Sequence, residues 1–160
     1  MNIFVTDTDP VISAKNLDDK RVIKMIAESA QLLATALYCN GIMDTPIKPT
    51  HINHPVAIWT RTTKQNYHWL LRHFVALCHE KRRRYPENKP HIYEQYIIYL
   101  RKNADVLPNF ILTPFVNCAA NKELNISYKH LTNTHKAYML YLNDRWDTDK
   151  RVPTWYRIEK

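Results

Sequence analysis

Three charged residues near the N-terminus, Arg21, Lys24 and Glu28, recur at the spacing of one helix face. Arg21 and Glu28 are seven residues apart, and Lys24 precedes Glu28 by four. A carboxylate beside two cations at the edge of an apolar stripe could be a general acid or base tuned by its neighbours. It could equally form a surface ion pair that stabilises the helix by a few tenths of a kcal/mol. The spacing alone leaves both interpretations open.

Two histidines, His51 and His54, form a second group of side chains that could do chemistry. As zinc ligands they would need a third partner, and no cysteine or acid stands at a usual ligand spacing. We predict instead that they contact a phosphate or a base edge, with helix capping as the alternative. The acidic pairs Asp9-Pro10 and Asp18-Asp19 are more typical of turns and caps than of a Mg²⁺ site. The sequence therefore predicts no metal and no cofactor.

The chain carries an excess of positive charge, with 23 Lys and Arg against 15 Asp and Glu and a formal net charge of +8. Such an excess favours a polyanionic partner, and we expect nucleic acid, in particular double-stranded DNA. For any single basic residue, a solvated helix face is the alternative interpretation. The predicted phosphate contacts are Arg21, Lys24, Arg61, Lys64, Arg82, Arg83 and Arg84.

The last residues of the chain combine aromatic and basic side chains. Trp155, Tyr156 and Arg157 could stack on, or wedge beside, a base that has been flipped out of the duplex. A tail folded back onto the core would use Trp155 equally well. We predict that the segment from Val152 onward contributes more to nucleic-acid binding than to folding.

The length of 160 residues suits one domain with its own core, over residues 1–160. The three cysteines, Cys39, Cys78 and Cys118, are widely spaced and odd in number, which indicates reduced thiols and a cytoplasmic location. We find no signal peptide at the start and no apolar stretch that approaches the ~20 residues needed to span a bilayer. We therefore expect no membrane association, and the composition indicates no particular oligomeric state.

The elements that must position these side chains are helices. Gly41 is the single glycine, which argues against a sheet-rich fold with many tight turns, and it stands where a left-handed cap would end a helix. Apolar residues recur at the helical period in several segments. The expected helices cover about 9–13, 18–39, 55–84, 92–101 and 127–146, with loops over 41–53 and 103–122 and an irregular tail over 147–160. The sequence thus predicts a compact, mainly α fold with long loops and a short extended N-terminal segment.

Three blocks of residues, in order along most of the chain, resemble the phage pyrimidine-dimer DNA glycosylases, the T4 endonuclease V family. Asp19-Lys20-Arg21 followed by Glu28 is similar to the family's first helix, where a glutamate stands at the same offset from an aspartate. Lys48-Pro49-Thr50 leads through His54 into a long helix with a basic end. Arg151-Val152-Pro153-Thr154-Trp155-Tyr156-Arg157 resembles the family's closing segment and is the most specific of the three blocks.

The resemblance implies a glycosylase site made of Glu28 and a free N-terminal α-amine, which Met1 or Asn2 would supply. A carboxylate can stabilise cationic character at C1′ or activate water, and an amine can form a Schiff base that leads to strand cleavage. Because Asn2 is too large for ordinary removal of Met1, we expect weaker trapping by borohydride than the family pattern implies. Two other residues depart from the family pattern: Arg21 replaces a histidine and Ala27 replaces an arginine.

We therefore predict a DNA-binding glycosylase that cleaves the N-glycosidic bond of a damaged or modified base, with an AP-lyase step if the amine reacts. By analogy with the phage family, it would act in the cytoplasm of an infected host cell. Two alternatives stay open: a basic helical protein that binds DNA without chemistry, and an enzyme that acts on free nucleotides or RNA. A steep dependence of affinity on salt would favour the duplex binder over the nucleotide enzyme.

Overall fold

A computed structural model describes residues 1–155 and is mainly α, as the sequence predicts. The described part contains six α-helices, two 3₁₀ turns and one antiparallel pair of two-residue strands. The α-helices are α1 (Pro10–Lys15), α2 (Asp19–Cys39), α3 (Pro55–Thr62), α4 (Lys64–Arg84), α5 (Ile97–Lys102) and α6 (Thr134–Thr148). The short elements are η1 (Ile92–Tyr96), η2 (Ala104–Val106), β1 (Ala120–Asn121) and β2 (Ile126–Ser127).

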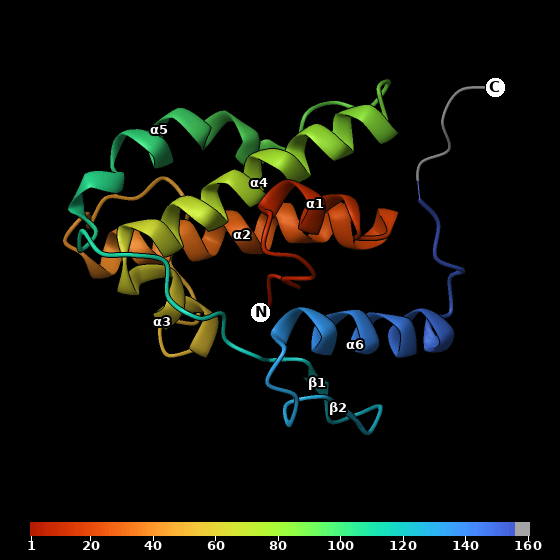
Figure 1. The fold of residues 1–160 in the computed structure, drawn as a ribbon. Helices are drawn as coiled ribbons and strands as arrows, with labels where there is room; N and C mark the ends of the chain where they lie inside the picture. Colours follow the sequence, from red (N-terminus) through yellow and green to blue (C-terminus); the bar gives the residue numbers. More distant parts are fainter. Residues whose placement is uncertain (156–160) are drawn as a thin grey trace.

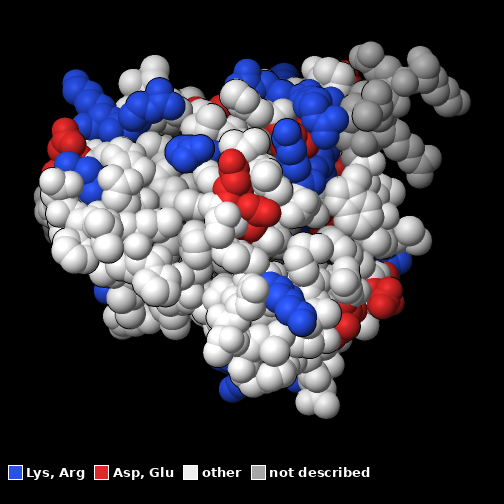
Figure 2. Space-filling model, in the orientation of Figure 1, with Lys and Arg blue, Asp and Glu red and all other residues white. Residues whose placement is uncertain are grey.

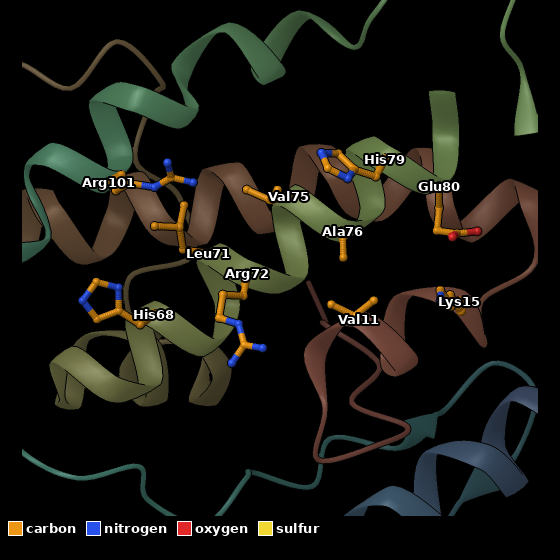
Figure 3. Close-up of a pocket in the computed structure, with 10 residues that line it drawn as sticks. All are labelled: Val11, Lys15, His68, Leu71, Arg72, Val75, Ala76, His79, Glu80 and Arg101. Carbon is orange, nitrogen blue, oxygen red and sulfur yellow. The ribbon is translucent and has the colours of Figure 1, made fainter. Parts of the chain in front are cut away.

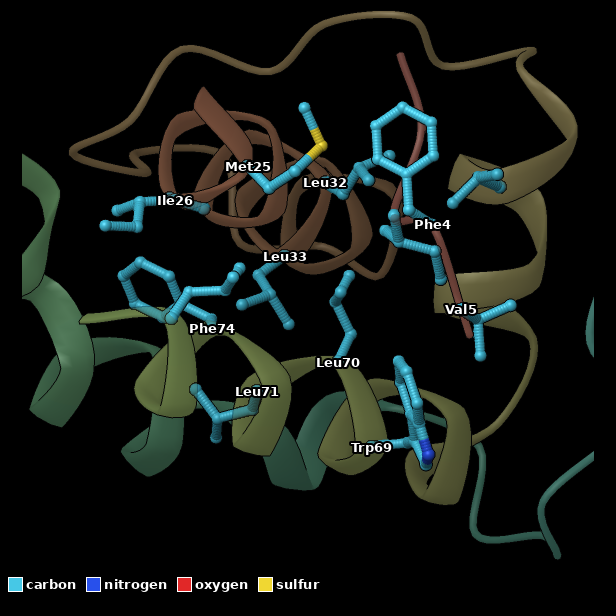
Figure 4. Packing of buried hydrophobic residues seen from close by; sticks show 14 of the residues in the cluster. Phe4, Val5, Met25, Ile26, Leu32, Leu33, Trp69, Leu70, Leu71 and Phe74 are labelled. Carbon is cyan, nitrogen blue, oxygen red and sulfur yellow. The ribbon is translucent and has the colours of Figure 1, made fainter. Parts of the chain in front are cut away.

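Helices α2 and α4 form the centre of the molecule, with α1 packed against α4, α5 on the far side of α4, and α6 on the opposite side (Figure 1). Their facing side chains interdigitate, so that Leu33 of α2 meets Leu70 and Phe74 of α4 (Figure 4). The extended segment at the chain start also enters this core, since Val5 is fully buried. The buried side chains form one cluster from Ile3 to Leu142.

The helices begin where polar side chains accept the first free N–H groups. The carboxylate of Asp9 accepts from Val11 and Ile12 at the start of α1, and Asp18 caps α2. These two caps confirm the interpretation of the acidic pairs as helix starts. Gly41 follows α2 with φ +100°, a conformation in which a side chain would be strained.

The helix expected over 55–84 is wrong as a single element, because the structure breaks it into α3 and α4. Thr63 has φ −140° and ψ 155°, and its side chain accepts the N–H of Asn66 as the cap of α4. The N–H of Lys64 is satisfied by the carbonyl of Pro108, 2.7 Å away. The polar run over residues 60–65 marks this break.

Three other expected boundaries also differ. The helix expected over 92–101 begins with the 3₁₀ turn η1, and the last helix begins at Thr134 rather than at 127. The expected loop over 103–122 contains η2 and β1. The cap of α6 is Asn133, whose side chain accepts the N–H of Lys136. Ser127, the expected first residue of this helix, instead pairs with β1 as part of β2.

Contrary to the expectation from sequence, α2 is long and apolar enough to cross a membrane by length and composition. The same test is passed by the core helix of a water-soluble protein, and α2 is mostly buried against α3 and α4. Its apolar residues are therefore explained by the core itself.

The buried His73 makes the stability of the fold depend on pH. Its Nδ1 lies 2.9 Å from the carbonyl of Pro10, while burial lowers the pKa of the imidazole from 6.5 to about 4. As the pH falls from about 6.5 to about 4, His73 takes up a proton in the unfolded chain but stays neutral in the folded chain. The free energy of unfolding should therefore drop by roughly 3 kcal/mol between pH 7 and pH 4 because of this one group.

Urea unfolding at several pH values tests this expectation, with His73→Asn as the matched variant. An asparagine can still donate to Pro10 but does not titrate, so the variant should lack this part of the pH dependence. Equal pH profiles for the two proteins would contradict the account.

Candidate active site

The start of the chain meets Glu28 in the middle of α2. The backbone N–H of Asn2 donates to Oε2 of Glu28 at 2.7 Å, and the α-amine of Met1 lies 3.9 Å from the same oxygen. The other oxygen, Oε1, is 3.5 Å from Nζ of Lys24. One carboxylate thus faces two cations and a backbone donor. The helix spacing that singled out Lys24 and Glu28 correctly places them together.

Burial of residues 3–5 holds the start of the chain next to Glu28. Ile3, Phe4 and Val5 are buried in the core, so the chain start has little freedom to move away from α2. The side-chain oxygen of Asn2 accepts the N–H groups of Ile3 and Phe4, and Phe4 takes a left-handed φ of +47°. Hydrogen bonds and packing therefore hold the amine at the carboxylate.

A cavity of about 270 Å³, here called the glutamate pocket, opens at this point. Its walls come from α2, α6, β1 and the chain start, and the N-terminus lies between α2 and α6 (Figure 1). The lining residues are Met1, Asn2, Phe4, Lys20, Arg21, Lys24, Met25, Glu28, Ala120, Asn121, Tyr141 and Arg145. Four basic side chains and the amine surround the single carboxylate, which makes the pocket attractive to an anionic substrate.

A second cavity of about 270 Å³, here called the histidine pocket, also borders the first two residues. It is lined by Met1, Asn2, His54, Pro55, Cys118, Ala120, Lys122 and Lys129. Sequence reasoning placed His54 among the binding residues but missed Lys122 and Lys129, and it missed Arg145 in the glutamate pocket. These three come from the hairpin region and α6, and no local spacing connects them with Glu28.

Arg21 lines the glutamate pocket but is held by the fold. Its Nη1 lies 2.9 Å from Oδ1 of Asp18 and 2.9 Å from Oδ2 of Asp149. Burial alone would lower the pKa of this guanidinium, yet the hydrogen bonds and charges of the two carboxylates raise it overall. Arg21 therefore ties α2 to the end of α6. The predicted phosphate contact is corrected to a buried bridge, because the guanidinium is already paired.

Arg84 is the clearest correction among the basic residues. Its side chain is 1% exposed, and it bonds Asp19, Glu80 and the carbonyl of Leu17. It stands four residues after Glu80 on the inner side of α4, so it cannot reach a phosphate. Arg82 pairs with Glu94, and Arg83 pairs with Glu80. Both are exposed at the basic end of α4, where a DNA contact stays a prediction.

The other predicted binding residues line neither pocket at the chain start. His51 is exposed and bonds Oγ1 of Thr50 at 2.7 Å. Arg61 donates to the carbonyl of Ile52, and Lys64 pairs with Asp105 at 3.0 Å. Their contact with nucleic acid stays a prediction.

The described part of the tail packs back onto the molecule. Thr154 bonds Asp19 twice, through its carbonyl and its hydroxyl, each at 2.8 Å. Trp155 donates from Nε1 to the carbonyl of Asn16 and meets the ring of Trp146 edge-on at 4.8 Å between centroids. These contacts hold the end of the described chain against α6 and the start of α2. Tyr156 and Arg157 lie outside the described residues.

Another cavity, of about 570 Å³, lies between α1, α4 and α5 (Figure 3). Leu71, Val75 and Val11 form an apolar floor, and basic side chains stand around it. The one carboxylate there belongs to Glu80, which already pairs with Arg83 and Arg84. The carboxylate in this cavity is therefore already engaged by two guanidinium groups, unlike Glu28 at the chain start.

The surface charge is uneven. In Figure 2, basic side chains gather over the upper half of the face shown, around α1, α4 and α5, with acidic side chains between them.

Within residues 1–155, no group of three or more His, Cys, Asp or Glu could hold a metal ion.

Residues 1–93 match the family model described as pyrimidine dimer DNA glycosylase. The chain belongs to that family. No curated protein and no solved structure matches it. Membership in this glycosylase family supports DNA glycosylase activity, DNA as the substrate and a role in DNA repair. The match spans α1 to α4 and therefore includes Glu28, the chain start and His54, whereas β1, β2 and α6 lie beyond it.

The tail contacts generate a prediction about Trp155. Replacing Trp155 with alanine removes one hydrogen bond and one aromatic pair, so it should lower the free energy of unfolding by about 1–2 kcal/mol. The affinity of the folded fraction for duplex DNA should stay unchanged. Thermal unfolding and a DNA titration of the same sample measure the two effects. An unchanged melting temperature with weaker binding would instead assign this ring to DNA.

Proposed function

We propose that the protein removes damaged pyrimidines from double-stranded DNA with Glu28 and the α-amine of Met1 as its two catalytic groups. The observation that carries this proposal is the shared contact of Asn2 N–H and the Met1 amine with one oxygen of Glu28, at 2.7 and 3.9 Å. A nucleophile held next to a carboxylate is the usual pair for covalent catalysis, and here the amine forms an ion pair with Glu28. A retained Met1 fits this geometry, since its side chain is 3% exposed beside the site.

In the first step, the amine nitrogen attacks C1′ of the damaged nucleotide. The N-glycosidic bond breaks, its electron pair goes to the leaving base, and the base takes up a proton. Glu28 stabilises positive charge at C1′ and receives a proton from the attacking amine.

In the second step, the sugar ring opens to a Schiff base between C1′ and the amine nitrogen. Loss of a proton from C2′ then breaks the C3′–O bond, and the phosphate leaves with the electron pair. Water hydrolyses the imine and frees the amine. This sequence accounts for AP-lyase activity without a metal ion.

Cys118 is not expected to replace the amine as nucleophile. Burial raises the pKa of its thiol, which keeps the sulfur protonated at neutral pH. The basic side chains of the glutamate pocket, Lys20, Lys24 and Arg145, would neutralise phosphates next to the lesion. Arg145 brings a guanidinium into the pocket in a chain that has Ala27 in place of the family's arginine.

The Glu28→Gln variant tests the proposal because it keeps the size of the side chain and a hydrogen-bond acceptor. We expect cleavage of the N-glycosidic bond in a dimer-containing duplex to slow by roughly 10²–10⁴-fold, because the charge at C1′ loses its partner. Affinity for the duplex should change little. Single-turnover kinetics and a binding titration give the two values.

Glu87→Gln is the matched control, since Glu87 is an exposed carboxylate in the turn after α4. It should behave as the unaltered protein. If Glu28→Gln releases the base at the normal rate, Glu28 is not catalytic. If the unaltered protein binds the duplex but releases no base, the alternative of a DNA-binding protein without chemistry replaces the proposal.

A further inference from the structure

The histidine pocket has a composition that the chemistry at Glu28 does not explain. It shares Met1, Asn2 and Ala120 with the glutamate pocket, and its other lining residues are different. Its polar lining is basic: His54 precedes α3, and Lys122 and Lys129 flank β2. No carboxylate lines it. The amine thus stands between two cavities with positive walls.

His54 presents a fixed hydrogen-bond donor. Its Nδ1 accepts the backbone N–H of Val56 at 3.2 Å, as the cap of α3. A neutral imidazole whose Nδ1 accepts must carry its proton on Nε2. Burial lowers the pKa of His54, and the charges of the Met1 amine and Lys129 lower it further. The ring therefore stays neutral at pH 7 and offers Nε2–H as a donor.

The two lysines are available to bind a ligand. Both are exposed, and within residues 1–155 neither side chain has a hydrogen bond or ion pair. The charge of Lys129 acts on both His54 and Cys118, which places it close to the pocket's other wall. The backbone there is held in place, because the N–H of Cys118 bonds the hydroxyl of Tyr138 and Asn117 bonds the carbonyl of Tyr128.

We propose that the histidine pocket binds a backbone phosphate of the damaged strand, next to the nucleotide whose C1′ is attacked, through Lys129, Lys122 and His54. This inference rests on the proposed function, because it takes the Met1 amine as the group that meets C1′. A phosphodiester fits the site: it is anionic, and its oxygens accept from ammonium groups and from a neutral imidazole N–H. The strand then crosses the chain start, which both cationic pockets border.

A base is a less suitable ligand for this pocket. Bases bind on aromatic faces, and the histidine pocket has no Phe, Tyr or Trp in its lining. It also lacks a carboxylate that could accept from an amino group of a base. Its donors outnumber its side-chain acceptors, as a phosphate requires.

The test combines Lys129→Ala with a duplex in which single phosphates flanking a pyrimidine dimer are replaced by uncharged methylphosphonates. Affinity is measured in a Glu28→Gln background so that turnover does not enter. We expect Lys129→Ala to weaken binding of the normal duplex roughly tenfold and to reduce the salt slope by about one. In the protein that keeps Lys129, a methylphosphonate at one position should weaken binding by a similar factor. On that same duplex, Lys129→Ala should cause no further loss of affinity.

Lys136→Ala is the matched control, because Lys136 is an exposed lysine of α6 outside both pockets. His54→Asn keeps a side chain that can cap α3 and should show a weaker loss at the same methylphosphonate position. Independent losses at every position, or a Lys129→Ala affinity equal to that of Lys136→Ala, would overturn the phosphate site. If the Glu28-containing protein binds but releases no base, the proposed function fails, while the coupling between Lys129 and one phosphate still decides this inference.

Discussion

The candidate active site depends on the burial of Ile3, Phe4 and Val5 in the core. A chain terminus is usually mobile because few contacts hold it, and a mobile amine would be a poor catalytic group. Here the hydrophobic effect fixes the residues that follow the amine, and the Asn2 N–H bonds Glu28 at 2.7 Å. The free energy that stabilises the core therefore also orders the α-amine that we propose as the nucleophile.

A buried network of charges at the start of α2 also helps to hold Glu28 in place. Asp18 and Asp19 stand at the start of this helix and pair with Arg21 and Arg84. Arg21 also pairs with Asp149 at the end of α6, and Arg84 links α2 to α4 because it is the last residue of α4. Leaving either guanidinium without its carboxylate would place an uncompensated charge in the interior, at a cost of several kcal/mol. The network thus fixes the direction of α2, and with it the position of Glu28 two turns further on. The positive net charge led us to expect that Arg21 and Arg84 bind DNA, but both side chains form buried ion pairs within the fold.

Local patterns in the sequence predicted what local physics decides. Helical periodicity placed Lys24 and Glu28 on one face, and the acidic pairs correctly marked the starts of α1 and α2. The break at Thr63 was missed because it is completed by Pro108, a residue far along the chain. Lys129 and Arg145 were missed for the same reason, since only the tertiary fold brings the hairpin and α6 to the chain start.

The central claim is that the α-amine beside Glu28 is the nucleophile. Borohydride reduction during turnover of a dimer-containing duplex, followed by mass spectrometry of the proteolysed adduct, tests it most directly. The account predicts deoxyribose attached to the α-nitrogen of Met1, and loss of the adduct when that nitrogen is acetylated. An adduct on a lysine side chain such as Lys24, or base release with no adduct at all, would contradict it.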